Sequence, residues 1–372
     1  MYRLHKVSDD ELLNLHIARP GGMWYNGEKT GKGGGHMKEL TATDIARALS
    51  ISRATVMRVL RDSQSVSPEK REAVLRYIGE NCPDADLTAD GTAYDIVAAI
   101  PSVPSFFWNR AMEGVRDACR AHPELRVKLL RYSGRRNTEE TLRIIGCVSR
   151  LQSRAAILVP VDAKAVSTAL ERLAAERKVL ILDNAADFAG CACAYCSDAA
   201  GEGERAVELV RAFPLERKKL LILTAQNDGG CNSQLRLDSF YRRCRGCTDI
   251  LPVAELGVSG TNALSPSILA RQLARLEDSY NCVYISDGFF YQACAALRKV
   301  GRLRDVYVLG HERSKPVMTL FDEGMRGAYI EQDIYAQAYA SVEAAVRLLN
   351  GKAPLEAPIP FRSGWYNYKP VV

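Results

Sequence analysis

The chain has 372 residues, 25% charged and 47% hydrophobic, a composition typical of ordinary globular proteins and not of disordered tails. At one domain per about 150 residues, this length predicts two or three domains. Lysine and arginine number 50 against 44 aspartates and glutamates, and the resulting charge of +6 permits an anionic partner without requiring one. No stretch approaches the roughly 20 apolar residues of a membrane-spanning helix, and the chain opens without the apolar region of a signal peptide. We therefore expect a cytoplasmic protein with no membrane partner.

The first 36 residues differ in composition from the rest. The glycine-rich run from Gly31 to His36 favours a flexible leader over a packed element. The same run is what a purine-rich ribosome-binding site yields when it is translated in frame, which would make Met37 the start of translation. We expect residues 1–36 to be either a disordered leader or a segment that precedes the true start.

Residues 37–82 predict three short helices. Thr41 with Asp44 three residues later has the spacing of a capping box, Ser52 is placed to cap a second helix, and Pro68 opens a third in its first turn. Three short helices with a tight turn between the first two form a helix-turn-helix unit. Residues 83–93, which hold a proline, a glycine and several aspartates, are the expected linker.

From residue 94 to residue 372, short apolar runs of β type alternate with amphipathic helical stretches. The expected strands are 95–100, 126–131, 155–160, 178–182, 220–224, 250–253, 282–285, 306–309 and 327–330, and the expected helices include 110–121, 139–151, 163–176, 202–212 and 265–278. Apolar strands separated by amphipathic helices predict parallel sheets covered on both faces. The region exceeds one comfortable core, so we expect two α/β lobes with a ligand at the carboxyl ends of their strands.

The helical segment resembles a known family. The stretches Asp44 to Ala46, Ile51 to Leu60 and Val66 to Arg71 follow the patterns D-[VI]-A, V-S-x-x-T-V-x-R-V-L and V-S-P-x-T-R. These are the patterns of the lactose-repressor (LacI) family of bacterial transcription regulators, and their joint spacing is more specific than a generic helix-turn-helix.

The later residues resemble the effector domain of the same family, which is built like a periplasmic sugar-binding protein. Ser105 to Trp108 follows the first strand where the family has N-P-F-F, and Ser233 to Phe240 follows S-x-x-R-x-x-G-F except at Ser239. Ser286-Asp287 and the run ending in His311-Glu312 stand where N-D and V-G-[FY]-D are usual. The resemblance implies a multidomain protein: an all-α helix-turn-helix domain at 37–82, a hinge at 83–93 and a two-lobed α/β periplasmic-binding-protein-like domain at 94–372.

The resemblance also implies how DNA would be bound. The helix from Arg53 to Leu60 would enter the major groove, where an arginine can form two hydrogen bonds to guanine. The implied DNA-binding residues are Thr41, Ser52, Arg53, Ala54, Thr55 and Arg58. The alternative is that the arginines are solvated helix surface. The linker departs from the family because Pro83 is kept while the usual alanine-arginine pair and a leucine at the equivalent step are missing. Leu87 could still intercalate, so DNA bending through a hinge helix stays open.

The implied effector is a sugar or polyol bound between the lobes of a homodimeric repressor. The candidate effector-binding residues are Phe107, Trp108, Arg110, Asp162, Asp183, Arg236, Asp287 and Gln332. The aromatic rings could stack on a sugar, although core packing is the alternative, and the aspartates could instead cap helices. Ligand would close the lobes about three crossings near Ser197, His311 and Gln332.

The cysteines supply a rival hypothesis, a metal- or redox-responsive regulator. Cys191, Cys193 and Cys196, and separately Cys244 and Cys247, have spacings that thiolate metal sites use, although reduced thiols buried as small hydrophobes are the simpler interpretation. No G-x-S-x-G elbow, phosphate loop or H-E-x-x-H motif occurs, so we expect no enzyme, no cofactor and no metal. A freestanding solute-binding protein would need an export signal and would have no helix-turn-helix.

Overall fold

The structure is a computed structural model. The described residues are 42–60, 66–67, 69–71, 73–74, 77, 92–102, 105–132, 137–226, 231–259, 266–276, 279–354 and 361–366. The expected leader at 1–36, Thr41 and residues 83–91 of the expected linker lie outside them.

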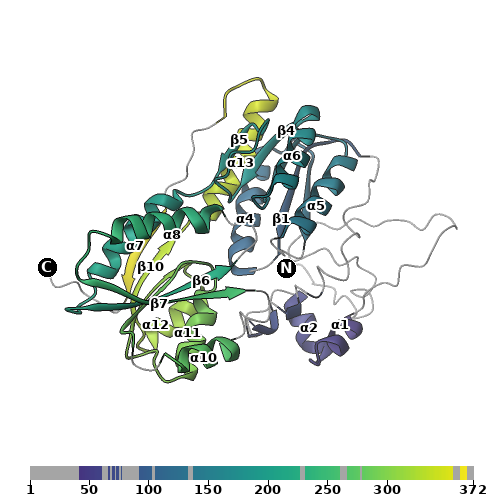
Figure 1. The fold of residues 1–372 in the computed structure, drawn as a ribbon. Coiled ribbons are helices and arrows are strands. Elements are labelled where there is room, and N and C mark those ends of the chain that lie inside the picture. Colours follow the sequence, from purple (N-terminus) through teal and green to yellow (C-terminus); the bar gives the residue numbers. More distant parts are fainter. Residues whose placement is uncertain are drawn as a thin grey trace, which may run out of the picture.

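The first α/β unit, which we term lobe 1, is a five-stranded parallel sheet in the order β2-β1-β3-β4-β5 (Figure 1). Its strands are β1 (Tyr94–Pro101), β2 (Val127–Tyr132), β3 (Ser153–Leu158), β4 (Lys178–Leu182) and β5 (Cys193–Tyr195). Its helices are α4 (Ser105–Ala121), α5 (Thr138–Arg150), α6 (Lys164–Glu176) and, from the end of the chain, α13 (Ile334–Leu349). Alternate residues of β1 pack against α4 and α13 on one face and against α5 and α6 on the other, because successive strand side chains point to opposite faces.

The second unit, lobe 2, is a six-stranded sheet in the order β11-β10-β9-β8-β6-β7. Its strands are β6 (Lys218–Gln226), β7 (Ile250–Ser259), β8 (Cys282–Ile285), β9 (Tyr307–His311), β10 (Arg326–Glu331) and the antiparallel β11 (Arg362–Tyr366). Helices α7 (Ala199–Arg211) and α8 (Cys231–Cys244) cover one face. Helices α10 (Pro266–Ala274), α11 (Phe290–Lys299) and α12 (Lys315–Asp322) cover the other, so both lobes have the layers expected from the alternation of strands and helices.

Within residues 42–60, two short helices precede lobe 1, α1 (Ala42–Ala48) and α2 (Arg53–Leu60), drawn in purple in Figure 1. The start of the expected third helix, Pro68, lies outside the described residues. A small apolar cluster joins them, and its buried members are Ile45, Ala46, Val56, Val59, Val66 and Val74. The hydroxyl of Ser52 accepts a hydrogen bond from the backbone N–H of Thr55 at 3.1 Å, which is how a serine caps a helix. No helix in the part of the chain that the structure describes is long and apolar enough to cross a membrane.

The chain passes between the lobes three times. It leaves lobe 1 after β5 at Ser197, returns after β10 at Gln332, and crosses again between the end of α13 and the start of β11. The expected crossing at His311 is therefore wrong. His311 ends β9, and the next elements, α12 and β10, stay in lobe 2 because they form an ordinary crossover between neighbouring parallel strands.

Candidate functional site

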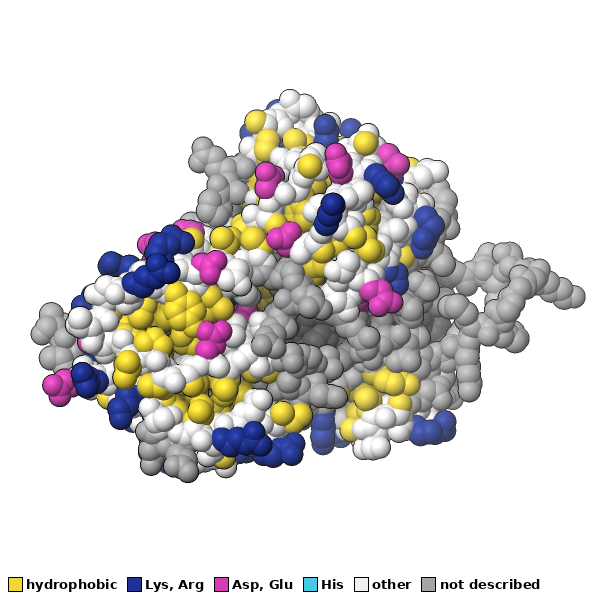
Figure 2. Space-filling model, in the orientation of Figure 1, with side chains coloured by type: hydrophobic (Ala, Val, Ile, Leu, Met, Phe, Trp, Pro, Cys, Tyr) yellow, Lys and Arg dark blue, Asp and Glu magenta, His cyan; other side chains and the backbone are white. Residues whose placement is uncertain are grey.

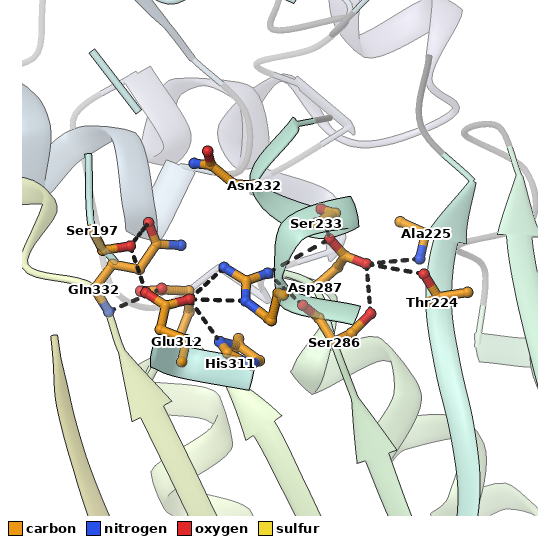
Figure 3. A network of polar contacts seen from close by, with 12 residues as sticks. Ser197, Thr224, Ala225, Asn232, Ser233, Ser286, Asp287, His311, Glu312 and Gln332 are labelled. Carbon is orange, nitrogen blue, oxygen red and sulfur yellow. Dashed lines mark hydrogen bonds and ion pairs between the residues drawn. The ribbon is translucent and has the colours of Figure 1, made fainter. Parts of the chain in front are cut away.

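Polar side chains gather at the carboxyl ends of the lobe 2 strands, beside the first two lobe crossings (Figure 3). They come from the ends of β6, β8 and β9, from the first turns of α7 and α8, and from the crossings. We term them the lobe-junction network: Ser197, Glu202, Thr224, Asn232, Ser233, Arg236, Ser286, Asp287, His311, Glu312 and Gln332. This is the edge at which α/β folds bind ligands.

A buried ion pair forms the centre of the network. Arg236 on α8 is 3% exposed and Glu202 on α7 is fully buried. The Nε and Nη2 atoms of Arg236 lie 2.8 and 2.6 Å from Oε2 of Glu202, and Nη1 donates to the carbonyl oxygen of Ser286 at 2.6 Å. Gly203 permits this contact, since a Cβ there would lie 2.1 Å from the carbonyl oxygen of Arg236. The guanidinium is thus both oriented and paired by its own chain.

Asp287 is engaged within lobe 2. Its Oδ2 accepts from the backbone N–H of Ala225 and from the hydroxyl of Ser286, both at 2.9 Å. Its Oδ1 accepts from the hydroxyl of Ser233 and lies 4.0 Å from Nη1 of Arg236. The carboxylate therefore ties the ends of β6 and β8 to α8. It does not cap the following helix α11, whose N-cap is Phe289, so the alternative of helix capping does not describe this residue.

Behind the ion pair lies His311, which is 1% exposed. Its Nε2 is 3.1 Å from the hydroxyl of Tyr284, and its Nδ1 is 3.7 Å from Oε2 of Glu202 and has no hydrogen-bond partner. Burial, followed by the nearby Arg236 guanidinium, holds the pKa of His311 well below its ordinary value. The imidazole is therefore neutral at neutral pH and adds no charge to the site.

Glu312 follows β9 directly and was missed by the sequence reasoning. It is 7% exposed, and burial followed by the proximity of Glu202 raises its pKa well above the ordinary value. Its Oε1 accepts from the backbone N–H of Gln332 at 3.2 Å, so it contacts the second lobe crossing. Its φ of +71° is unusual for a residue with a side chain, and such strain is common at functional sites. The sequence did contain a signal for this residue, because Glu312 stands at the aspartate position of the family pattern V-G-[FY]-D.

The two crossings contact each other through side chains. The hydroxyl of Ser197 lies 2.5 Å from Oε1 of Glu202 and 3.0 Å from Oε1 of Gln332. A hydroxyl donates its one proton to a single acceptor at a time. If Ser197 donates to Glu202, its contact with Gln332 is a hydrogen bond only when the side-chain amide of Gln332 is turned so that its N–H donates to the Ser197 oxygen. Both crossings are thereby connected to the Arg236–Glu202 pair by hydrogen bonds.

Asn232, in the first turn of α8, joins the two lobes directly. Its side-chain amide donates to the carbonyl oxygen of Asp183 at 3.1 Å and accepts from the backbone N–H of Ala185 at 2.9 Å, both just after β4 of lobe 1. Asp183 has a φ of +56°, which turns the chain toward α8. Asn232 therefore connects lobe 2 to lobe 1 through two hydrogen bonds.

We expect Asn232→Ala to open the lobes, because it removes both hydrogen bonds, each worth about 0.5–1.5 kcal/mol. Small-angle scattering of the ligand-free protein should show a larger radius of gyration than the wild type. Gln234→Ala, on the same helix with its side chain bonded only to Asp238, is the matched control. An unchanged radius in Asn232→Ala would contradict this role.

The structure brings only part of the predicted effector set together. Arg236, Asp287 and Gln332 lie in the network, and Asp183 contacts it through its backbone. Phe107 and Trp108 lie instead in the core of lobe 1, 7% and 1% exposed, with their rings edge to face. Arg110 and Asp162 are exposed side chains of lobe 1. The buried positions of the two rings agree with the alternative of core packing.

The predicted DNA-binding residues share one side of α2, except Thr41, which lies outside the described residues. Ser52, Arg53, Ala54 and Arg58 are exposed, and Thr55 is half-buried with its hydroxyl 2.9 Å from that of Ser52. Val56 and Val59 face inward, so the helix presents its polar residues to solvent.

Four of the five cysteines with metal-site spacings pack in or against the apolar cores: Cys191, Cys193, Cys244 and Cys247. Burial raises the pKa of Cys191, Cys193, Cys196 and Cys244 to about 11. Among the described residues, no group of three or more histidines, cysteines, aspartates or glutamates is placed to hold a metal ion. These four thiols are therefore protonated at neutral pH, whereas thiol exchange requires the thiolate.

We expect these four thiols to react slowly with a disulfide reagent at neutral pH, since their thiolate fraction is about 100-fold below that of an ordinary thiol. Mass spectrometry of labelled peptides measures each site, with the urea-unfolded chain as the reference for full reactivity. Rapid native labelling of Cys191 or Cys193 would favour the redox hypothesis.

Two α/β lobes joined by three crossings, with polar groups at the strand ends between them, define a two-lobed binding protein. Residues 96–353 match the sequence model of the periplasmic binding protein domain, and the chain belongs to this family. A search of curated proteins by sequence finds no match.

Solved structures share the fold at low identity. The glucose-galactose binding protein GanP from Geobacillus stearothermophilus is similar, with a TM-score of 0.64 and 15% identity over 74% of this chain and 97% of its own. A structure from Bacteroides fragilis named as a LacI transcriptional regulator has a TM-score of 0.63 and 13% identity, covering 74% of this chain and 96% of its own. A carbohydrate transporter solute-binding protein from Agrobacterium radiobacter, in complex with D-arabinose, has a TM-score of 0.64 and 16% identity over 74% and 94%.

Proposed function

We propose that the protein is a sequence-specific DNA-binding transcription regulator, a repressor, whose operator affinity is controlled by a sugar or polyol bound between its two lobes. The observation that carries the proposal is the order of its parts: a compact two-helix unit with exposed arginines stands ahead of a periplasmic binding protein domain. In this proposal residues 37–82 bind the operator, 83–93 link the parts and 94–372 bind the effector.

The DNA-binding half rests on the exposed side of α2. Arg53 and Arg58 project to solvent while Val56 and Val59 anchor the helix on α1, the arrangement that a recognition helix needs. Figure 2 shows Lys and Arg side chains in dark blue at the lower edge of the molecule, around these N-terminal helices. A cationic surface of this kind favours phosphates, and arginine is suited to reading guanine.

The effector-binding half rests on the lobe-junction network. Arg236 offers N–H donors at the strand ends, and Glu312 and Gln332 connect that edge with a crossing. A ligand bound there would stabilise one arrangement of the lobes, and in a homodimer it would change the spacing of two operator-binding heads. The Agrobacterium radiobacter structure holds D-arabinose and one from Agrobacterium vitis holds alpha-D-tagatopyranose, which supports a sugar-like ligand here.

A second candidate is a solute receptor for a transporter. Several of the similar structures are named as solute-binding or sugar-binding components of transporters, which favours it. Such a receptor would have no affinity for DNA, so duplex binding separates the two candidates. The cytoplasmic location and the homodimer belong to the regulator proposal alone.

The test is selection of duplexes from a random pool by the full-length protein, followed by titration of the selected duplex at increasing salt. A regulator should enrich a palindromic sequence and lose affinity steeply with salt, because bound phosphates release counterions. Failure to enrich any sequence would favour the solute receptor.

A further inference from the structure

The charges around the buried pair of Glu202 and Arg236 determine which ligand charge the site can accept. Three of the five N–H groups of Arg236 are engaged: two by one carboxylate oxygen of Glu202 and one by the carbonyl oxygen of Ser286. Asp287 lies 4.0 Å from Nη1 on the same guanidinium. One cation thus faces two carboxylates, and the group as a whole has an excess of negative charge.

We propose that Glu202 is a specificity-determining residue: by pairing with Arg236 it confines the binding site to uncharged polyols and rejects sugars that bear a carboxylate. The inference rests on the proposed sugar-binding function of this site and names the residue that sets its charge preference.

Neutral and charged ligands would meet this pair differently. A hydroxyl brings no charge, so accepting a hydrogen bond from Arg236 would leave the guanidinium paired with Glu202. A ligand carboxylate would have to displace Glu202 or share the cation with Glu202 and Asp287, and like charges held close in a buried site repel strongly. Glu202 is fully buried, and its carboxylate is engaged by Ser197 as well as by Arg236, so displacing it would break both contacts.

Glu202→Gln tests the proposal, since it removes the charge and keeps the shape. Calorimetric titration of the full-length protein would compare neutral sugars with their acids, namely galactose with galacturonate, glucose with glucuronate and arabinose with arabinonate. We expect the wild type to prefer the neutral member of a pair, and the variant to shift the ratio of the two dissociation constants toward the acid by at least about tenfold.

Two further variants separate charge from structure. Glu202→Asp keeps the charge and should keep the wild-type preference, whereas Glu204→Ala, on the same helix with an exposed side chain, should change nothing. Equal weakening of both sugars in Glu202→Gln would mean that the residue only supports the fold. A wild type that prefers the acids would overturn the inference and leave the proposed function standing.

A measurement without sugar covers the case in which no member of the panel binds. Glu202→Ala opens a space beside an unpaired guanidinium, and sodium formate should fill it and raise the melting temperature of this variant in a saturable way. If Glu202→Ala does not fold, Glu202→Ser, whose short side chain leaves the same space, takes its place in the titration. The wild type and Glu204→Ala should show no such rise. If no sugar of the panel binds but formate stabilises the variant, the sugar ligand is rejected, and the result supports the inference that the Glu202 charge keeps anions away from Arg236. If formate does not stabilise the variant, the inference is overturned.

Discussion

Arg236→Met is expected to lower the free energy of unfolding by about 3–5 kcal/mol, because the substitution leaves Glu202 buried without its cation. Glu202 is fully buried, so water cannot replace the two hydrogen bonds that the guanidinium donates. The loss of the bond to the Ser286 carbonyl adds to the cost. Equilibrium unfolding in urea measures the difference.

The control for this experiment is Arg242→Met on the same helix. Arg242 is exposed, and a surface substitution of this kind changes stability by no more than about 0.5 kcal/mol. Equal and small effects of the two substitutions would show that the pair contributes nothing to stability. The double variant Arg236→Met with Glu202→Gln should recover part of the loss, since it removes both buried charges.

Replacing both Arg53 and Arg58 with alanine is expected to weaken binding to the selected operator by about 100-fold or more, since each bidentate contact with guanine contributes ~1–3 kcal/mol. Arg58→Ala alone should relax the preference at one base pair. Both side chains are exposed, so the free energy of unfolding should stay within about 0.5 kcal/mol of the wild type. Fluorescence anisotropy with labelled duplexes gives the affinities.

Replacing both Arg242 and Arg243 with alanine is a suitable control here, because it removes the same two charges from exposed positions of lobe 2. It should leave operator affinity unchanged apart from a small general effect of net charge. Unaltered operator selectivity in the Arg53 and Arg58 double variant would refute the assignment of α2 as the recognition helix.

Local patterns were enough to predict most of the fold. The bounds of β4 and β8 match the expected runs 178–182 and 282–285, because each is an apolar stretch that is buried on both faces. Two strands were missed. β5 has three residues, and β11 reads Arg-Ser-Gly-Trp-Tyr, so neither shows an apolar run, and both form only by pairing with a neighbouring strand.

The site was predicted less completely than the fold. Arg236 and Asp287 could be predicted because they belong to short motifs at strand and helix ends. Glu202 could not, because its importance arises from the close approach of α7 to α8 at Gly203, a contact between elements that local sequence does not reveal. The aromatic pair was ambiguous for the same reason, since only the packing of α13 on α4 places Trp108 in the core.

In the proposed function, a small ligand bound between the lobes changes the affinity of the N-terminal helices for DNA. The direct measurement is the dissociation constant of the full-length protein for its selected duplex, at fixed salt, with and without a saturating sugar that stabilises the protein in a thermal-shift screen. A coupling free energy of about 1–3 kcal/mol predicts a change of roughly 5–150-fold. An affinity that is the same with and without the ligand, or no salt-sensitive affinity for any duplex, would contradict the account.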